Sequence, residues 1–287
     1  MIIKKSTISK IEEKILKLTK PKYMNSEIEI EKFLAKKLKA KDKTIKTLFK
    51  TKKYNDNQVL TFGNENKERI ILYIHGGGYI NEINIQHKIY SYLLSRKLNA
   101  YVLMPIYPLT PKYTYKETYE LISHIYEELL KQEKEIILMG DSAGGGFAIS
   151  FCQYLNTINL EQPNYLITFS PWLDLSMSGE YKEIEETDPI LGMIGLKAIG
   201  EKWAGDLDTQ NYKVSPYFGD NTNLPKTLIF TGTNEIFYTD IKKYYEKLKN
   251  EKIDVNLIEG EDLFHIYPLF PNPESKKVLK IIKNLIK

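Results

Sequence analysis

The sequence predicts an α/β protein built around a parallel, doubly wound sheet. Six runs of about six to eight mainly apolar residues follow one another along the chain, and helical patterns separate them. Such runs are typical of strands buried on both faces of a sheet, and their alternation with helices favours parallel pairing. With 287 residues, the chain is long enough for one large domain with a sizeable core.

The elements are predicted in a regular order. Amphipathic patterns on either side of Pro21 indicate N-terminal helices over 7–19 and 27–40. Two short strands are expected over 44–54 and 58–63, with a polar turn at Asn55-Asp56-Asn57. The buried strands are predicted at 69–75, 100–107, 135–140, 165–170, 227–232 and 255–260. The remaining helices are predicted at 85–97, 115–132, 143–156, 238–250 and 274–286. The long connection between 170 and 227 indicates an insertion.

Composition argues against several classes of protein. The chain has 41 basic and 37 acidic residues, but Arg69 and Arg96 are its two arginines. Phosphate and base-edge recognition favours arginine, so we expect no nucleic-acid binding. Cys152 is the one cysteine, which excludes an intramolecular disulfide. The N-terminus lacks the apolar segment of a signal peptide, and no window reaches the roughly 18 to 20 apolar residues of a membrane span. We therefore expect a cytoplasmic protein that does not bind membranes.

A G-x-S-x-G motif at Gly140-Asp141-Ser142-Ala143-Gly144 follows one buried strand and opens a helix. Small residues two positions before and after Ser142 allow a sharp turn that exposes its Oγ at the carboxyl end of the sheet. The helix N-terminus adds free N–H groups and the positive end of the helix dipole. A tight structural turn or a phosphate cradle could use the same glycines, but the usual nucleotide-binding motifs are absent. Ser142 is therefore the predicted nucleophile, and Asp141 is expected to be structural.

Three consecutive glycines after the strand at 69–75 predict an oxyanion hole. His75-Gly76-Gly77-Gly78 matches the HGGG-type partner of a nucleophile turn. Glycine leaves no Cβ in the way, so backbone N–H groups can approach a developing oxyanion, where such donors lower the barrier by several kcal/mol. We expect the N–H groups of Gly77 and Gly78 to act with that of Ala143. His75 is expected to fix the loop by hydrogen bonds.

His265 is the predicted general base, because it follows the last predicted strand, where the chain order Ser, acid, His requires it. The imidazole pKa suits proton transfer near neutral pH. His87 and His124 lie on predicted helices and are expected to be surface or packing residues.

The acid that orients the base must lie between Ser142 and His265. Glu235, three residues beyond Gly232 in a strand-to-helix loop, is the favoured candidate. Asp240 is the alternative, although it is expected to begin or cap the next helix. Asp262 is a third candidate, but it lies so close to His265 in the chain that a turn role fits it better.

The chain resembles the hormone-sensitive-lipase-like esterases of the α/β-hydrolase superfamily. The resemblance covers residues 70–270 and rests on "HGGGY" at 75–79, "YPLTPK" at 107–112, "GDSAGGG" at 140–146, "SPWLDLS" at 170–176 and "TDPIL" at 187–191. It implies the α/β-hydrolase fold, with a mostly parallel eight-stranded sheet flanked by helices and a helical cap. The cap would comprise residues 1–45 and an insertion at 180–215, and residues 46–287 would form the hydrolase domain with this insertion.

The resemblance also implies hydrolysis of short-chain carboxylic esters without a metal or an organic cofactor. Three positions depart from the family pattern. Pro108 replaces an arginine of the usual "YRLAP", Glu235 stands where aspartate is more usual, and Ile266 replaces the glycine after His265. The first change removes a structural salt bridge, and the second leaves the identity of the acid open.

The sequence therefore predicts a serine carboxylesterase that acts on a small-molecule ester. Aromatic residues beside the motifs are expected to line an acyl or alcohol pocket or to pack in the core: Tyr79, Trp172, Phe237 and Tyr267. An amidase, formamidase, peptidase or acyltransferase would use the same triad, and a small-molecule receptor of this fold is a further alternative. The lysine-rich N-terminal helices would suit a lipid surface, although a cap is the simpler account. A homodimer is also possible, although the sequence identifies no interface.

Overall fold

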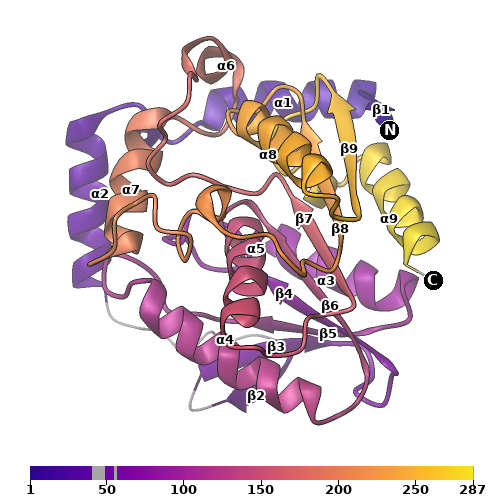
Figure 1. The fold of residues 1–287 in the computed structure, drawn as a ribbon. Helices are drawn as coiled ribbons and strands as arrows, with labels where there is room; N and C mark the ends of the chain where they lie inside the picture. Colours follow the sequence, from indigo (N-terminus) through magenta and orange to yellow (C-terminus); the bar gives the residue numbers. More distant parts are fainter. Residues whose placement is uncertain (41–48, 55–56, 287) are drawn as a thin grey trace.

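A central sheet separates two layers of helices (Figure 1). The computed structural model describes residues 1–40, 49–54 and 57–286. The described strands lie in the order β1-β9-β8-β7-β6-β4-β5-β3-β2. They are β1 (Ile2–Lys4), β2 (Lys50–Tyr54), β3 (Asn57–Phe62), β4 (Arg69–Ile74), β5 (Tyr101–Pro105), β6 (Glu135–Asp141), β7 (Tyr165–Phe169), β8 (Lys226–Gly232) and β9 (Val255–Glu261). All neighbours are parallel except β3, which is antiparallel to both β2 and β5.

The described sheet has nine strands, so the expected eight-stranded sheet was wrong by one. The additional strand, β1, is the N-terminal stretch before the first helix. It pairs in parallel with β9, with Ile2 opposite Glu259 and Ile3 opposite Gly260. A three-residue strand of sequence Ile-Ile-Lys has no periodicity of its own, and its partner β9 lies near the other end of the chain. Local sequence patterns therefore could not predict it.

Each buried strand contributes alternate side chains to two apolar cores. Ile70 and Leu72 belong to the core beneath α4, α5 and α8, whereas Ile71 and Tyr73 belong to the core beneath α3 and α9. These helices are α3 (Ile85–Lys97), α4 (Tyr115–Leu130), α5 (Ser142–Thr157), α8 (Tyr238–Asn250) and α9 (Pro273–Leu285), with short 3₁₀ helices η2 (Pro216–Phe218) and η3 (Tyr267–Leu269). Burial on both faces explains why β4 to β9 read as near-continuous apolar runs.

The predicted helices and buried strands match the observed ones closely. The strand predicted over 44–54 is observed as Lys50–Tyr54, and residues 44–48 lie outside the described residues. Two residues of the predicted turn, Asn55 and Asp56, also lie outside them.

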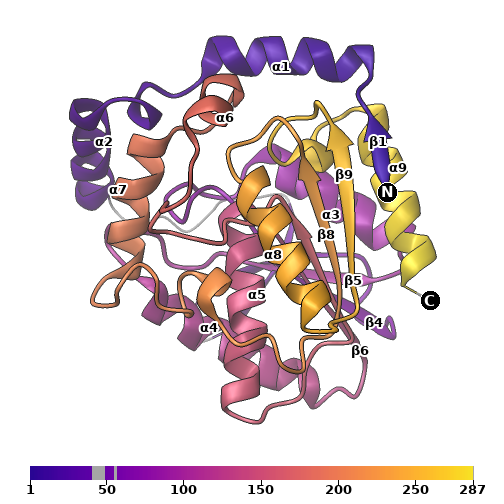
Figure 2. The same cartoon turned by 45° about the horizontal axis from the view of Figure 1, so that its top comes forward.

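The N-terminal helices lie beside the insertion that follows β7. They are α1 (Thr7–Thr19), η1 (Lys22–Met24) and α2 (Glu27–Lys39), and the insertion contributes α6 (Lys182–Thr187) and α7 (Met193–Ala204). Figure 2 shows α1 running along the edge of the molecule from β1 to the pair formed by α2 and α7. A Cβ atom on Gly192 would lie 2.6 Å from the Met24 carbonyl oxygen, and one on Gly195 would lie 2.8 Å from Met24 Cα. Glycine at these positions therefore lets the two segments approach closely.

Candidate active site

The chain turns sharply at Ser142, between the end of β6 and the first turn of α5. The φ angle of Ser142 is 52°, in the left-handed region that non-glycine residues rarely adopt. The turn needs glycine on both sides. A Cβ atom on Gly140 would lie 2.3 Å from the Gly144 carbonyl oxygen, and one on Gly144 would lie 2.1 Å from the Ile74 carbonyl oxygen. This tight packing against β4 holds Ser142 in its strained conformation.

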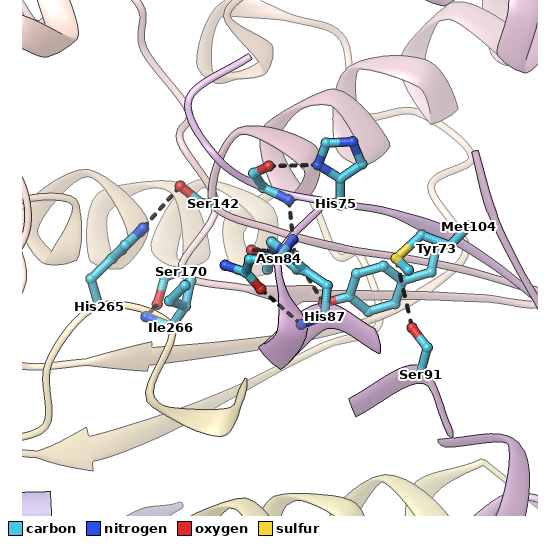
Figure 3. Close-up of polar contacts among 12 residues, drawn as sticks. Tyr73, His75, Asn84, His87, Ser91, Met104, Ser142, Ser170, His265 and Ile266 are labelled. Carbon is cyan, nitrogen blue, oxygen red and sulfur yellow. Dashed lines mark hydrogen bonds and ion pairs between the residues drawn. The ribbon is translucent and has the colours of Figure 1, made fainter. Parts of the chain in front are cut away.

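The structure brings His265 to Ser142. His265 lies in the loop after β9, and its Nε2 atom is 2.9 Å from the Ser142 Oγ atom (Figure 3). Both side chains are buried. The next residue, Ile266, has a φ of 49° and donates its backbone N–H to the Ser170 hydroxyl at 2.9 Å. The loop therefore holds the imidazole through its backbone as well as through the contact with the serine.

Of the three candidate acids, Glu235 lies beside the imidazole. Its Oε2 atom is 3.4 Å from His265 Nδ1, an ion-pair distance that is longer than a good hydrogen bond. The carboxylate is completely buried and accepts hydrogen bonds from the hydroxyls of Ser170 at 2.6 Å and Thr231 at 2.7 Å. These two bonds fix its position in the loop after β8.

The other two candidates make different contacts. Asp240 lies in the first turn of α8, where its carboxylate accepts a hydrogen bond from the Tyr181 hydroxyl at 2.5 Å. Asp262 occupies an exposed turn with a φ of 57°, and its carbonyl oxygen accepts a hydrogen bond from Lys5. Neither carboxylate lies within ion-pair distance of His265, whereas that of Glu235 does.

A fourth carboxylate, Asp188, lies near the imidazole, and sequence reasoning missed it. Its Oδ1 atom accepts the N–H groups of Ile190 and Leu191, and its Oδ2 atom accepts that of Ile236 at 2.8 Å. Burial raises the pKa of Asp188, while the nearby His265 and these N–H groups act in the opposite direction. Asp188 was noted in the sequence only as part of the "TDPIL" stretch, and no role was predicted for it. Asp188 ties the insertion to the loop that carries Glu235.

The three glycines after β4 serve different needs. A Cβ atom on Gly76 would lie 2.2 Å from Asp141 Oδ2, so this position requires close approach. Gly77 and Gly78 have φ angles of 107° and 63°, which favour glycine. Because β4 pairs with β6, this loop lies beside the turn at Ser142. The arrangement places the two glycines with positive φ next to the first turn of α5, whose N–H groups have no acceptor within the helix.

A buried polar network holds the glycine loop to Asp141, the residue before Ser142. The Asp141 carboxylate accepts hydrogen bonds from the Tyr73 hydroxyl at 2.9 Å, the Gly76 N–H at 3.0 Å and His87 Nε2 at 3.2 Å. His87 Nδ1 accepts the Asn84 N–H, so its proton is on Nε2. Burial alone would raise the pKa of Asp141, but the His87 ring and the three donors outweigh it and lower that pKa. His87 is therefore a buried partner of Asp141 rather than a surface residue.

His75 fixes the loop from the other side. Its Nδ1 atom donates to the Gly76 carbonyl oxygen at 2.7 Å, and its ring stacks on Tyr107 with centroids 4.3 Å apart. The Tyr107 hydroxyl donates to the His75 carbonyl oxygen at 2.7 Å. Burial and the neighbouring His87 lower the pKa of His75 to about 3. The ring is therefore neutral at pH 7.

Three of the four predicted pocket residues form one aromatic row. Tyr79 stacks on Trp203 at 4.0 Å and lies 5.9 Å from the ring of Trp172. Trp172 in turn lies 5.8 Å from Phe237, whose ring meets His265 edge-on at 5.3 Å. All four aromatic side chains in the row are buried. Trp203, on α7, was not singled out from the sequence because nothing local distinguishes it from a core residue.

Two residues of the row are tied to the turn at Ser142. The Tyr79 hydroxyl donates to the Ala143 carbonyl oxygen at 2.7 Å, and the backbone N–H of Trp172 donates to the Ser142 carbonyl oxygen at 3.0 Å. The fourth predicted residue, Tyr267, lies in the core beneath α3 and α9 instead.

Other predicted features lie away from the serine. His124 is partly exposed, with its ring 6.4 Å from that of Tyr54. The Cys152 thiol is buried, and burial raises its pKa. Among residues 1–40, 49–54 and 57–286, no three His, Cys, Asp or Glu side chains are grouped to hold a metal ion. No helix in the same described ranges is long and apolar enough to cross a membrane.

Comparisons with known proteins agree with this geometry. Residues 71–269 match the family described as alpha/beta hydrolase fold. The chain is 31% identical over 219 residues to an esterase of Acinetobacter venetianus, covering 74% of this chain and 72% of the relative. It is 27% identical over 219 residues to an acetyl-hydrolase of Streptomyces hygroscopicus, covering 74% and 73%. A crystal structure of a Staphylococcus aureus protein proposed to be an esterase superimposes with a TM-score of 0.85 at 27% identity, covering 92% of this chain and 94% of that one.

Proposed function

We propose, from the premise that this chain belongs to the α/β-hydrolase-fold family and is a carboxylic ester hydrolase, that it cleaves short-chain acyl esters through an acyl-enzyme on Ser142. The observation that carries the proposal is the 2.9 Å contact between His265 Nε2 and Ser142 Oγ at a strained strand-to-helix turn. Nucleophile and base within hydrogen-bond reach, with a third group behind the base, are the arrangement that serine hydrolysis requires.

In the proposed reaction, Ser142 Oγ attacks the ester carbonyl carbon while its proton passes to His265 Nε2. The carbonyl oxygen becomes an oxyanion, which the N–H groups of Gly77, Gly78 and Ala143 stabilise. Collapse of the tetrahedral intermediate breaks the bond to the alcohol oxygen, which takes the proton from His265. Water then attacks the acyl carbonyl with His265 as base, releasing a carboxylic acid and restoring Ser142.

Glu235 is assigned the role of the orienting acid, and Asp240 is the lesser alternative. A buried carboxylate beside Nδ1 keeps the proton on that nitrogen, so that Nε2 can accept from the serine, and it stabilises the imidazolium. The 3.4 Å separation of Glu235 Oε2 from His265 Nδ1 is short enough to tighten once the ring is charged.

The aromatic row supports a short acyl chain, of the acetyl type. The Tyr79 hydroxyl contacts the backbone of the turn at Ser142, and the Phe237 ring contacts His265, so bulky buried rings lie close to the serine. We assign residues 1–45 and 180–215 to a cap over the site, and residues 41–45 of this segment lie outside the described residues. The support is the close packing of Gly192 and Gly195 against Met24 and the place of Trp203 within the row.

The test is an acyl-chain series of p-nitrophenyl esters from acetate to decanoate, read as kcat/KM. We expect acetate or butyrate to be preferred and Ser142→Ala to abolish turnover and labelling by a fluorophosphonate probe. Ser123→Ala, on α4, is the matched control and should change neither. Full activity of Ser142→Ala would refute the mechanism, and a preference for decanoate would refute the short-chain assignment.

The same catalytic groups could serve an amidase, formamidase, peptidase or acyltransferase. Parallel assays with the matching anilides and with added alcohol acceptors separate these activities. Higher kcat/KM on an anilide than on its ester would reassign the leaving group while leaving the role of Ser142 intact. A protein that neither turns over any ester nor reacts with the probe would instead be a receptor.

A further inference from the structure

The apolar side of α1 faces solvent. Four large apolar side chains recur along one side of this helix and are exposed: Ile8 (48%), Ile11 (55%), Ile15 (55%) and Leu18 (88%). Ser9, on the opposite side, is buried, and Glu12 and Glu13 are partly covered. Leu16 is partly buried and packs against the core beneath α3 and α9, but the other four apolar side chains of α1 face outward. Most of the apolar surface of α1 therefore has the reverse of the usual orientation, in which the apolar stripe packs on the core.

Contacts on the polar side hold the helix in this orientation. The Glu12 carboxylate accepts a hydrogen bond from the Asn272 amide at 3.0 Å, and that of Glu13 accepts one from the Asn234 amide at 2.7 Å. The Lys5 ammonium group donates hydrogen bonds to the Glu13 carboxylate at 2.6 Å and to the Asp262 carbonyl oxygen at 2.7 Å. These contacts reach loops after β8 and β9, so α1 is fixed at the edge of the sheet where those strands end. Rotating the stripe inward would break them.

Positive charge is concentrated around the stripe. Residues 1–40 contain 11 lysines and 5 glutamates, a net charge of +6, which leaves 30 basic and 32 acidic residues, a net −2, for the rest of the chain. Lys10, Lys14 and Lys17 are exposed and lie three or four positions apart, so they form a row along one flank of the stripe. Lys17 also lies 3.4 Å from Glu13.

We propose that α1 docks the protein on an anionic lipid surface. The helix would lie flat, with its apolar stripe at the boundary of headgroups and acyl chains and its lysine row against anionic headgroups. At 13 residues it is about 20 Å long, which suits surface attachment rather than spanning. A second copy is a poorer occupant, because pairing two such faces by two-fold symmetry would bring their lysine-rich flanks together.

The orientation of α1 adds to what its sequence indicates. Amphipathic, lysine-rich helices fit a cap as well as a lipid surface, but a helix that served only as a cap would turn its apolar side toward the protein. The proposal does not depend on the ester chemistry, because it concerns exposed residues that make no contact with the serine.

Sedimentation of the full-length protein with vesicles tests the proposal. Vesicles of phosphatidylcholine alone are compared with vesicles containing about a third phosphatidylglycerol, at low and at raised salt. We expect binding to the anionic vesicles that weakens with salt. The double variant Ile11→Ser/Ile15→Ser should weaken binding at least about tenfold, and Lys10→Gln/Lys14→Gln should weaken it about fivefold for each lysine replaced.

Two control variants test whether a loss of vesicle binding is specific to α1 or follows from any decrease in surface hydrophobicity or positive charge. Ile158→Ser removes a 44% exposed isoleucine after α5, and Lys243→Gln/Lys249→Gln removes two exposed lysines from α8. Neither should alter binding. All variants should keep the wild-type circular dichroism spectrum, since the replaced side chains are exposed. Absence of wild-type sedimentation with anionic vesicles would overturn the proposal. So would a concentration-dependent dimer in light scattering that Ile11→Ser/Ile15→Ser abolishes, because it would assign the stripe to a second copy.

Discussion

The Nδ1 atom of His265 lies 3.4 Å from the Oε2 atom of Glu235, and no hydrogen bond within the described residues satisfies it. That same carboxylate oxygen accepts the Ser170 hydroxyl at 2.6 Å. The glutamate is thus positioned by the hydroxyls of Ser170 and Thr231 before it interacts with the imidazole.

Replacing Glu235 by glutamine should lower kcat/KM on p-nitrophenyl acetate by about 10³ to 10⁴. Glutamine keeps the size of the side chain but removes the charge that we propose holds the imidazole tautomer and stabilises the imidazolium, and this loss sets the magnitude. Steady-state kinetics near pH 8 provide the measurement. Asp240→Asn is the matched control and should change kcat/KM by less than about threefold, because its carboxylate bonds Tyr181 rather than the base.

Asp188→Asn tests whether the second buried carboxylate shares this role. Asp188 holds three backbone N–H groups, including that of Ile236 next to Glu235, so we expect a loss of about tenfold in kcat through displacement of the loop. A larger loss than that of Glu235→Gln would transfer the role of the acid to Asp188. The comparison is meaningful only if both variants bind the fluorophosphonate probe stoichiometrically after extended incubation.

The sequence predicted the elements that carry chemistry because their local requirements are strict. A strained turn at Ser142 needs glycines at 140 and 144, and buried parallel strands need continuous apolar runs. Both requirements restrict which residue types can stand at neighbouring positions, so both can be recognised in the sequence. The choice between Glu235 and Asp240 depended on where α8 begins, and helix boundaries are weakly marked in sequence. Geometry places Glu235 beside the base and Asp240 away from it.

Features that depend on contacts between distant parts of the chain could not be recognised from the neighbouring sequence. Trp203 joins the row beside the serine from α7, more than sixty residues beyond Ser142 in the chain. His87 lies on a helix that reads as ordinary, yet its ring is buried against Asp141. Such pairs form only when the order of strands in the sheet brings α3 and the end of β6 together. No short stretch of sequence determines that order.

The neutral His75 should make stability depend on pH. Its pKa is lowered from the ordinary value of 6.5 to about 3, so between these values the unfolded chain binds a proton that the folded chain does not. The contribution of His75 to stability is therefore complete above pH 6.5 and is lost progressively as the pH falls toward 3. At pH 5 the loss amounts to about 2 kcal/mol relative to pH 8.

Urea unfolding of wild type and His75→Gln from pH 8 to pH 5 measures this dependence. The variant should start less stable, since it loses the stack on Tyr107, but its free energy of unfolding should fall less steeply with decreasing pH. Ser123→Ala changes no ionisable side chain and should keep the wild-type slope. Parallel curves for wild type and His75→Gln would contradict the assignment of a buried, neutral ring.

The network around Asp141 should control the position of the glycine loop. His87→Leu removes the Nε2 donor, whereas His87→Gln offers an amide donor of similar reach. We expect His87→Leu to lower kcat by about tenfold to a hundredfold with little change in KM, since the loop donors act on the oxyanion rather than on the bound ester. His87→Gln should recover much of this activity. Equal losses in the two variants would indicate a packing role alone.

Alanine at Gly76 should be far more damaging than alanine at Gly78. A Cβ atom on Gly76 would lie 2.2 Å from Asp141 Oδ2 and 2.8 Å from the Asp141 carbonyl oxygen, so the loop would have to move away from β6. A Cβ atom on Gly78 would have no neighbour nearer than Ile80 Cγ2 at 3.9 Å, which leaves the φ of 63° as the main cost, about 1 to 2 kcal/mol. Urea unfolding should therefore show a loss for Gly76→Ala at least about twice that for Gly78→Ala, in line with the cost of forced overpacking. Comparable stability of the two variants would mean that the loop is not pressed against Asp141 and that its N–H groups are not held for the oxyanion by this contact.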